Sequence, residues 1–208
     1  MKRKTLTLHL AAVLLPVLVS TRALSAANSP MDQIRAAVEK VLTVLNDPNL
    51  KAEGRKAERR AQLKQIIYPK FDFQEMAKRS LGSQWQRRTP EEQREFTDVF
   101  TLLLEKAYVD QIESYNGEKV RYGRQNQEGN LAEVDTKIVN KKGEEFSVDY
   151  KLHLVEGDWK VYDVVIENIS LVNNYRSQFS RVLAKSSFEE LLRTMKEKKS
   201  LASGKKKS

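Results

Sequence analysis

The stretch that decides the fold is residues 131–166, LAEVDTKIVNKKGEEFSVDYKLHLVEGDWKVYDVVI. Apolar and polar residues alternate along it with a period of two, which is typical of strands that bury one face. Two turn sequences, Lys141–Lys142–Gly143 and Glu156–Gly157–Asp158, divide the alternation into three strands. Short turns between consecutive strands predict an antiparallel meander.

The last strand of this stretch departs from simple alternation. Val164–Val165–Ile166 is apolar on both faces of the pattern. We therefore expect the strand from Trp159 to about Ile169 either to be covered on both faces or to contain a bulge. An earlier strand at about residues 120–122 brings the sheet to four or five strands.

Helical periodicity is present on both sides of the sheet. Ser29 before Pro30 marks the start of a first helix, and Thr89 before Pro90–Glu91–Glu92 marks the start of the longest one. Runs of helices and then of strands indicate an α+β fold, with a twisted, mainly antiparallel sheet wrapped by about six or seven helices. We predict helices at about residues 30–46, 51–68, 73–81 and 90–115 before the sheet and two after it, the last capped by Ser186.

The longest helix and the sheet both present apolar surfaces, which we expect to face each other. Such surfaces either interdigitate into a core or stay apart and enclose an apolar cavity, and composition leaves both possibilities open. The helix contributes Phe100, Leu104, Tyr108 and Ile112, and the sheet contributes Val134, Ile138, Phe146, Val148 and Tyr150.

The ends of the 208-residue chain differ in composition from its middle. Basic residues at positions 2–4, an apolar run at 6–19 and small residues at 23–27 predict a cleaved secretory signal peptide over residues 1–27. An uncleaved anchor is the alternative. Residues 28–199 are expected to form a single domain and residues 200–208 a basic, disordered tail. Without the signal peptide the formal charge falls from +9 to +5.

Composition excludes most catalytic and metal chemistry. The chain has no cysteine, and His153 is its only histidine after residue 27. The residues that thiol nucleophiles, thiolate metal sites and Ser-His or Cys-His catalysis require are therefore missing. We expect no metal site and no enzyme. His153 is expected to be exposed and structural. Asp163 and Glu167 cannot be placed on a face, so an acid–base enzyme built on the sheet remains an alternative.

Fragments spread along nearly the whole chain, about residues 31–195, carry a family resemblance. They are Phe73-Gln74-Glu75-Met76-Ala77, Leu81-Gly82 with Trp85, Thr89-Pro90-Glu91-Glu92, Phe96 with Phe100, Leu103, Leu104 and Tyr108, Val148-Asp149-Tyr150-Lys151-Leu152, Trp159-Lys160-Val161-Tyr162-Asp163-Val164, Ile169-Ser170-Leu171-Val172, and Asn174-Tyr175-Arg176 with Phe179. In order and spacing they resemble the MlaC, or toluene-tolerance, family of periplasmic phospholipid-binding proteins. The charged helix at 51–68 and the lysine tail depart from that pattern.

The resemblance implies a periplasmic carrier, expected to be monomeric, that holds a glycerophospholipid as cargo and needs no cofactor or nucleic acid. Its partners would be an inner-membrane ABC-type transporter complex and an outer-membrane lipoprotein complex, and its role the maintenance of outer-membrane lipid asymmetry. A hopanoid-related lipid carrier and a ligand-free periplasmic interaction module are the alternatives. The acyl chains would lie in an apolar pocket between sheet and helices, lined by Phe73, Phe100, Leu103, Leu104, Tyr108, Ile112, Val134, Ile138, Phe146, Val148, Tyr150, Val161, Val165 and Tyr175.

Overall fold

The structure is a computed structural model that describes residues 29–204, without the side chains of residue 53 and residues 198–204. The expected signal peptide (residues 1–27) and the last four residues of the expected tail lie outside the described residues. The elements are α1 (Pro30–Asn46), α2 (Pro48–Lys51), η1 (Glu53–Arg55), α3 (Lys56–Ile67), η2 (Tyr68–Lys70), α4 (Phe73–Leu81), η3 (Gly82–Arg87), α5 (Pro90–Glu113), β1 (Lys119–Glu128), β2 (Leu131–Val139), β3 (Glu145–Val155), β4 (Asp158–Ile166), β5 (Ile169–Ser170), α6 (Leu171–Leu183) and α7 (Phe188–Gly204).

Side-chain caps start the helices where the sequence predicts. The side chain of Ser29 accepts a hydrogen bond from the first turn of α1, and the Glu75 N–H donates to Asp72 Oδ1 (2.9 Å) at the start of α4. At α5 the capping box is complete, because Thr89 and Glu92 each accept a hydrogen bond from the other's backbone N–H. These caps satisfy N–H groups that have no partner within the helix.

Two of the helices differ from the prediction. The expected helix at 51–68 is divided into α2, η1 and α3, because Ala52 is extended and Gly54 is a poor helix former. The last helix is capped by Ser187 rather than Ser186, since the Glu190 N–H donates to Ser187 Oγ (3.2 Å). That helix, α7, also continues to Gly204 and so includes residues that the sequence assigns to the tail.

The five strands form one antiparallel sheet in sequential order, β1-β2-β3-β4-β5, which confirms the predicted α+β meander. The predicted irregularity in the last long strand is a bulge. Lys151 pairs with Asp163 while Leu152 pairs with Val161, which leaves Tyr162 as an extra residue in β4. A second irregularity interrupts β1 between Tyr122 and Gln125.

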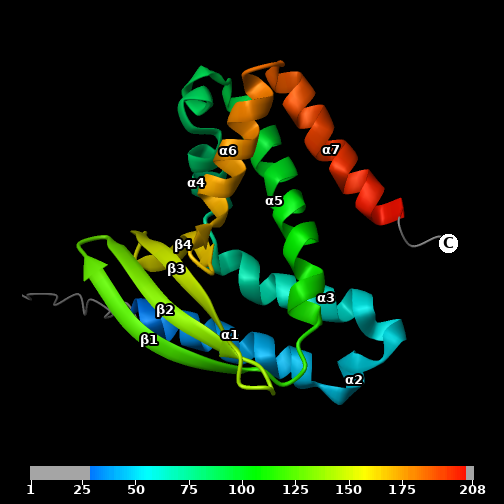
Figure 1. The fold of residues 1–208 in the computed structure, drawn as a ribbon, viewed down its shortest axis with the longest axis vertical. Coiled ribbons are helices and arrows are strands. Elements are labelled where there is room, and N and C mark those ends of the chain that lie inside the picture. The colour runs from blue at the N-terminus through cyan, green and yellow to red at the C-terminus, as the bar shows by residue number, and fades with distance from the viewer. Residues whose placement is uncertain (1–28, 205–208) are drawn as a thin grey trace, which may run out of the picture.

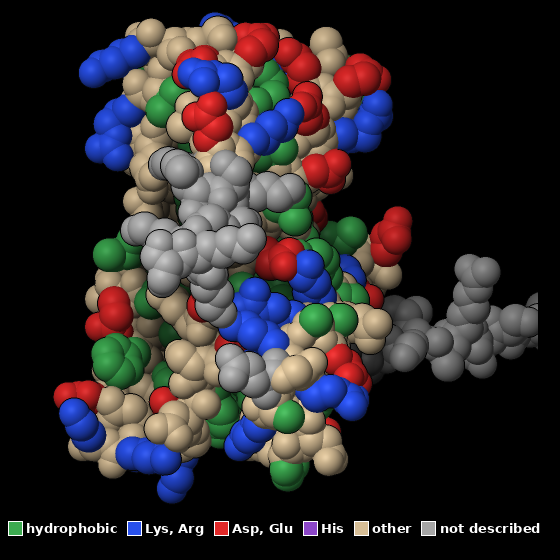
Figure 2. All heavy atoms as spheres, turned by 90° about the vertical axis from the view of Figure 1, so that its right-hand side faces the viewer, with side chains coloured by type: hydrophobic (Ala, Val, Ile, Leu, Met, Phe, Trp, Pro, Cys, Tyr) green, Lys and Arg blue, Asp and Glu red, His purple; other side chains and the backbone are tan. Residues whose placement is uncertain are grey.

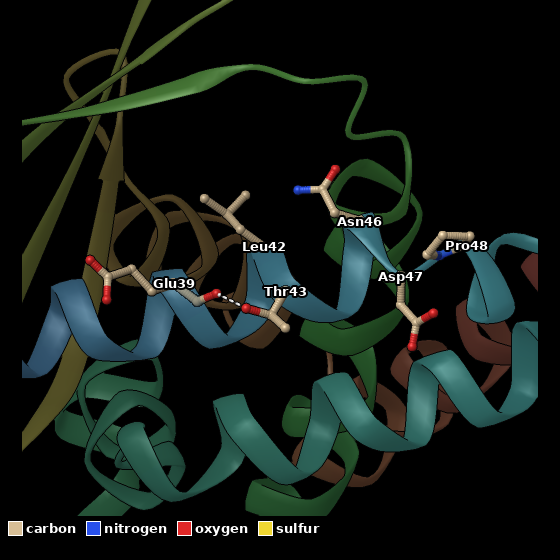
Figure 3. Close-up of a pocket in the computed structure, with 6 residues that line it drawn as sticks. All are labelled: Glu39, Leu42, Thr43, Asn46, Asp47 and Pro48. Atoms are coloured by element: carbon tan, nitrogen blue, oxygen red, sulfur yellow. Dashed lines mark hydrogen bonds between the residues drawn. The ribbon is translucent and has the colours of Figure 1, made fainter.

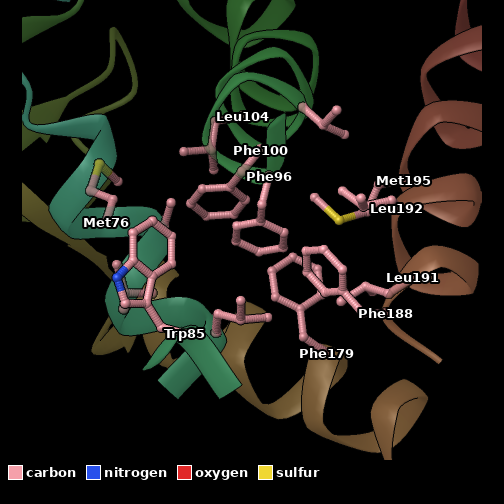
Figure 4. Packing of buried hydrophobic residues seen from close by; sticks show 14 residues of the cluster. Met76, Trp85, Phe96, Phe100, Leu104, Phe179, Phe188, Leu191, Leu192 and Met195 are labelled. Atoms are coloured by element: carbon pink, nitrogen blue, oxygen red, sulfur yellow. The ribbon is translucent and has the colours of Figure 1, made fainter. Parts of the chain in front are cut away.

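The molecule has a helical part and a sheet part (Figure 1). α4, α5, α6 and α7 form one group, the sheet curves around α1, and α5 descends from the group toward α3. The helical part is closed by what we call the helical cluster, drawn in Figure 4, in which aromatic rings from α5, α6 and α7 meet. Its members are Met76, Ala77, Leu81, Trp85, Phe96, Val99, Phe100, Leu104, Val172, Phe179, Phe188, Leu191, Leu192 and Met195.

The sheet part has a smaller core of its own, the sheet cluster. Six of its members come from β2, β3 and β4, and one, Ile34, comes from α1. Met31 and Val38 of α1 pack against it as well, so α1 covers the sheet on one side, while Leu171 of α6 covers it beside β4. The sheet cluster consists of Ile34, Ala132, Val134, Leu152, Trp159, Val161, Val164 and Leu171.

The prediction that the longest helix faces the sheet along its length is wrong. Phe100 and Leu104 belong to the helical cluster, and Ile112 packs near α1 and α3. Only Tyr108 of α5 packs against both the helical and the sheet cluster. The reason is length: a helix of 24 residues extends about 36 Å, farther than either core reaches, so α5 joins the two parts instead of lying on one.

Charged side chains fasten the lower end of α5 to α3. Glu113 is nearly buried, with 5% of its side chain exposed, and lies 3.0 Å from Arg59 and 2.6 Å from Arg60. About two turns earlier on α5, Glu105 pairs with Lys64 (2.6 Å). Figure 2 shows basic side chains gathered at mid-height of one face, next to acidic ones. The unusual charge of α3 is therefore largely matched by carboxylates of α5.

Candidate functional site

One face of the sheet carries most of the predicted lining residues. Cross-strand pairing places Ile138 beside Phe146 and Val134 beside Tyr150, and Tyr150 beside Val164. Because side chains alternate between the two faces of a strand, these residues share one face, which also holds the sheet cluster. We call this the inner face.

The inner face is closed at one end and open at the other. At the closed end the side chains are almost fully buried; they are Ala132, Val134, Leu152, Trp159 and Val161. Toward the β2–β3 turn the apolar side chains retain contact with solvent, and Phe146 is 44% exposed. The open end consists of Ile138, Phe146, Val148 and Ile166.

The difference follows from where α1 lies. The Met31 N–H donates to Gln125 Oε1 (2.8 Å), which holds the start of α1 against the middle of β1. Arg35 then lies over the ring of Tyr122, with its guanidinium carbon 4.6 Å from the ring centroid. α1 therefore runs beside β1 and β2, and the ends of β3 and β4 near Val148 and Ile166 remain only partly covered.

Three partly buried tyrosines lie on β3, α5 and α6. Burial raises the pKa of Tyr150 on β3 to about 12. Tyr175 of α6 packs its ring edge-on against Phe100 at a centroid distance of 5.3 Å, and burial raises its pKa to about 12. Burial also raises the pKa of Tyr108 on α5. All three side chains are neutral near pH 7, so their hydroxyl groups are uncharged polar atoms.

The structure divides the predicted lining residues among several surroundings. Ile138, Phe146, Val148 and Tyr150 lie on the accessible part of the inner face, and Val134 and Val161 are buried in the sheet cluster. Tyr108 joins the two clusters, and Ile112 packs against the contact of α1 with α3. The remaining residues of the helical part are Phe100 and Leu104, which are buried in the helical cluster, and Phe73, Leu103 and Tyr175, which pack against it.

Val165 lies on the opposite face of the sheet from the other residues. It pairs with Asp149, whereas its neighbours Val164 and Ile166 pair with Tyr150 and Val148. The cause is the bulge in β4, which shifts the alternation by one residue, so that Val161 and Val165 do not share a face. We therefore exclude Val165 from the candidate lining.

Several residues of this site are missed by the sequence argument. Ile166 joins the open end, and Met31 and Val38 come from α1. Ile166 is missed because β4 is apolar in both registers, so the sequence does not show that the bulge places Ile166 on the inner face. The apolar stripe of α1 is visible in the sequence, but its contact with the sheet is not.

Asp163, which the sequence does not place on a face, and His153 both have structural partners. Asp163 is buried, and its Oδ1 accepts the Val172 N–H (3.1 Å) while its Oδ2 accepts the Ser170 hydroxyl (2.6 Å) at the start of α6. His153 is partly buried rather than exposed, because its Nε2 lies 3.0 Å from Asp72 Oδ2 at the cap of α4. Both carboxylates thus connect the sheet to a helix start.

Two surface hollows lie away from the inner face. One is a shallow groove beside the end of α1, where Glu39, Leu42, Thr43 and Asn46 spread apart and only the Thr43 hydroxyl bonds back, to the Glu39 carbonyl (Figure 3). The other lies between α4 and α6 beside Arg176 and is mostly polar. The groove beside α1 is mostly apolar, and neither hollow is lined by a residue of the sheet.

Within residues 29–204, no group of three or more His, Cys, Asp or Glu side chains is arranged to hold a metal ion. None of the helices described over the same range is long and apolar enough to cross a bilayer.

Comparisons with known proteins agree on one family. A family model described as MlaC protein matches residues 35–197, well over half of the chain. The chain is 25% identical over 126 residues to the toluene tolerance protein ttg2D of Pseudomonas putida, a match that covers 60% of this chain and 59% of that protein. It is 22% identical over 182 residues to the intermembrane phospholipid transport system binding protein MlaC of Haemophilus influenzae, with 85% of each chain covered.

A solved structure is similar as well. It is a phospholipid-binding protein from Ralstonia solanacearum in complex with a phospholipid, with a TM-score of 0.75 and 28% sequence identity. The similarity covers 83% of this chain and 98% of that one. Together with the fold and the partly open apolar face, the family match leads to one assignment: this chain belongs to the MlaC protein family.

Proposed function

We propose that this protein is a periplasmic carrier that shelters the acyl chains of one glycerophospholipid against the open end of the inner face. The observation that carries the proposal is that Phe146, Val148, Tyr150 and Ile166 turn inward from the sheet and yet keep contact with solvent. In a closed core, other residues of the protein would cover these side chains. A bound acyl chain would cover them here. The related Ralstonia protein, which binds a phospholipid, supports the same cargo.

The energetics suit a carrier better than a tight receptor. Each CH₂ group that leaves a bilayer for water loses about 0.8 kcal/mol, so two ordinary acyl chains lose on the order of 20 kcal/mol. A surface of Val, Ile, Phe and Tyr side chains returns most of that loss. Exchange between protein and bilayer is then nearly balanced, and the docking partners decide the direction of transfer.

The route of transfer belongs to the same proposal. We propose that the carrier is exported by its residues 1–27, acts as a monomer, and moves lipid between an inner-membrane ABC-type transporter complex and an outer-membrane lipoprotein complex. Such transfer would maintain outer-membrane lipid asymmetry. The name of the Haemophilus relative, an intermembrane phospholipid transport system binding protein, supports this route. No catalytic step and no cofactor is part of the proposal.

Native mass spectrometry of the purified protein tests the proposal directly. We expect a complex with one glycerophospholipid, which lipid extraction and fragmentation would identify. A hopanoid in its place would correct the cargo, and protein without any lipid would contradict the carrier function.

A matched pair of variants tests the location. Phe146 and Leu131 are both large, apolar and about half exposed on the sheet, at 44% and 50%, but Leu131 lies at the far end of β2. We expect Phe146→Asp to lose most of the co-purified lipid and Leu131→Asp to keep it, with both proteins folded by circular dichroism. Equal lipid content in the two folded variants would exclude the open end as the binding surface.

A further inference from the structure

Tyr108 lies at the boundary between the helical part and the sheet part, and Tyr175 lies near Tyr108. Tyr108 of α5 packs against both the helical and the sheet cluster. Tyr175 of α6 packs against the helical cluster, where its ring contacts those of Phe100 (5.3 Å) and Phe179 (5.6 Å between centroids). The two phenols are near enough that Tyr108 contributes to the raised pKa of Tyr175. Aromatic neighbours therefore hold the ring of Tyr175, and its phenol lies near that of Tyr108.

Neither hydroxyl has a hydrogen-bond partner among the described residues. Another half-buried tyrosine of this chain does have one: the Tyr68 hydroxyl donates to Glu105 Oε2 (2.6 Å). Neither hydroxyl oxygen is among the fully buried side-chain atoms that lack a partner, so water can reach both, and a bound acceptor would take the place of that water. The boundary thus presents two donors that the protein itself leaves unused.

The surroundings of the pair indicate which kind of acceptor fits. Burial, and for Tyr175 the neighbouring phenol, account for the raised pKa values of Tyr108 and Tyr175, and no charged side chain is among the causes. Both groups are therefore neutral donors near pH 7. A phosphate would lose part of its hydration beside these neutral donors, which is costly. A neutral carbonyl oxygen carries no such cost.

We propose that Tyr108 and Tyr175 form a subsite that donates hydrogen bonds to the ester carbonyls of the bound lipid. This inference rests on the proposed carrier function and names the part of the cargo that these residues recognise. The ester groups join the acyl chains to the glycerol, so holding them at this boundary directs the chains along the inner face and leaves the headgroup outside. The subsite would then favour ester-linked over ether-linked lipids, because an ether lacks the carbonyl oxygen.

Competitive loading tests the subsite. The protein is stripped of lipid and incubated with vesicles containing equal amounts of dipalmitoyl phosphatidylglycerol and its di-O-hexadecyl analogue, and bound lipid is quantified by mass spectrometry. The ester-to-ether ratio is compared between wild type and Tyr108→Phe/Tyr175→Phe, which cancels any difference between the two lipids in the vesicle. Two hydrogen bonds of ordinary net strength predict a ratio about tenfold lower in the double variant.

The control and the outcomes separate this inference from the proposed function. Tyr162→Phe removes a hydroxyl on β4 whose ring lies near His153 and Arg79, away from the inner face, and should leave the ratio unchanged. A double variant that loads lipid with the wild-type ratio would overturn the subsite and leave the carrier intact. Failure of the wild type to load either lipid would overturn the carrier and the subsite together. If the double variant unfolds, the two single Tyr→Phe variants give the same comparison.

Discussion

The helical cluster and the inner face of the sheet are built from the same kinds of residue but differ in closure. In the helical cluster Phe96, Phe100 and Phe179 meet at centroid distances of 5.6–6.0 Å and are almost fully buried. On the inner face Phe146 and its neighbours point inward and remain accessible. Hydrophobicity alone therefore does not distinguish core from binding surface; the number of elements that cover a residue does.

The number of covering elements has a simple origin. The helical cluster is enclosed by α4, α5, α6 and α7, which supply side chains from all sides. The inner face is covered by α1, which runs beside β1 and β2, by Leu171 of α6 and Phe71 on the side of β4, and by Tyr108 of α5. We therefore expect the helical cluster to contribute more to the stability of the fold, and the inner face to keep apolar area available for a ligand.

The largest expected effect is in the closed part. Phe96→Ala removes a ring with no exposed surface that contacts Phe100, Phe179 and Phe188. Because the surrounding helices cannot collapse fully into the space, we expect the free energy of unfolding to fall by about 3–5 kcal/mol. Urea unfolding followed by circular dichroism measures it. A loss below about 1 kcal/mol would mean that the helical part is not the stable one.

The contact between α5 and α3 comes next, because it fixes the end of the helix that joins the two parts. Desolvation alone would raise the pKa of Glu113, but hydrogen bonds from Arg60 and Arg59 outweigh it and hold the pKa below its ordinary value. Glu113→Gln leaves these guanidinium groups without their carboxylate. We expect a loss of about 2–4 kcal/mol in urea unfolding at pH 7.

The pH dependence of that loss has a definite sign. Since folding lowers the pKa of Glu113, its contribution is complete above the ordinary value of 4.5 and disappears as the pH falls through the folded pKa. The difference between wild type and Glu113→Gln should therefore shrink below pH 4.5. Glu91→Gln is the control, because Glu91 and its partner Arg94 are both about 70% exposed, and it should change nothing measurable. A difference that persists unchanged into acid would contradict the role of the ionised carboxylate.

Much of the fold could be predicted because it is encoded locally. Ser29, Asp72 and Thr89 mark helix starts through caps that involve only the next few residues, and strand alternation depends on nearest neighbours. The part of the fold that the sequence does not predict has a local cause as well. Most of β1 was missed because its second half, from Gly123 on, is an exposed polar edge with no apolar alternation.

The candidate site was harder to predict, because it depends on contacts distant in sequence. Leu104 and Val148 are similar aliphatic residues, yet one is enclosed by helices and the other lies at the open end. The sequence gives no sign of that difference, since both positions require an apolar side chain. Val165 shows the second limit: the single extra residue Tyr162 reverses the faces of β4 beyond it.

The smallest expected effect on stability completes the comparison. Phe146→Ala makes the same chemical change as Phe96→Ala, but at a side chain that is already 44% exposed and partly free of neighbours. We expect the free energy of unfolding of the lipid-free protein to change by about 0.5 kcal/mol or less, while co-purified lipid decreases. Loss of the Phe96 ring would then lower the stability of the fold, whereas loss of the Phe146 ring would lower the amount of bound lipid. A loss at Phe146 as large as that at Phe96 would show that side chains of the protein, and not a ligand, fill the open end.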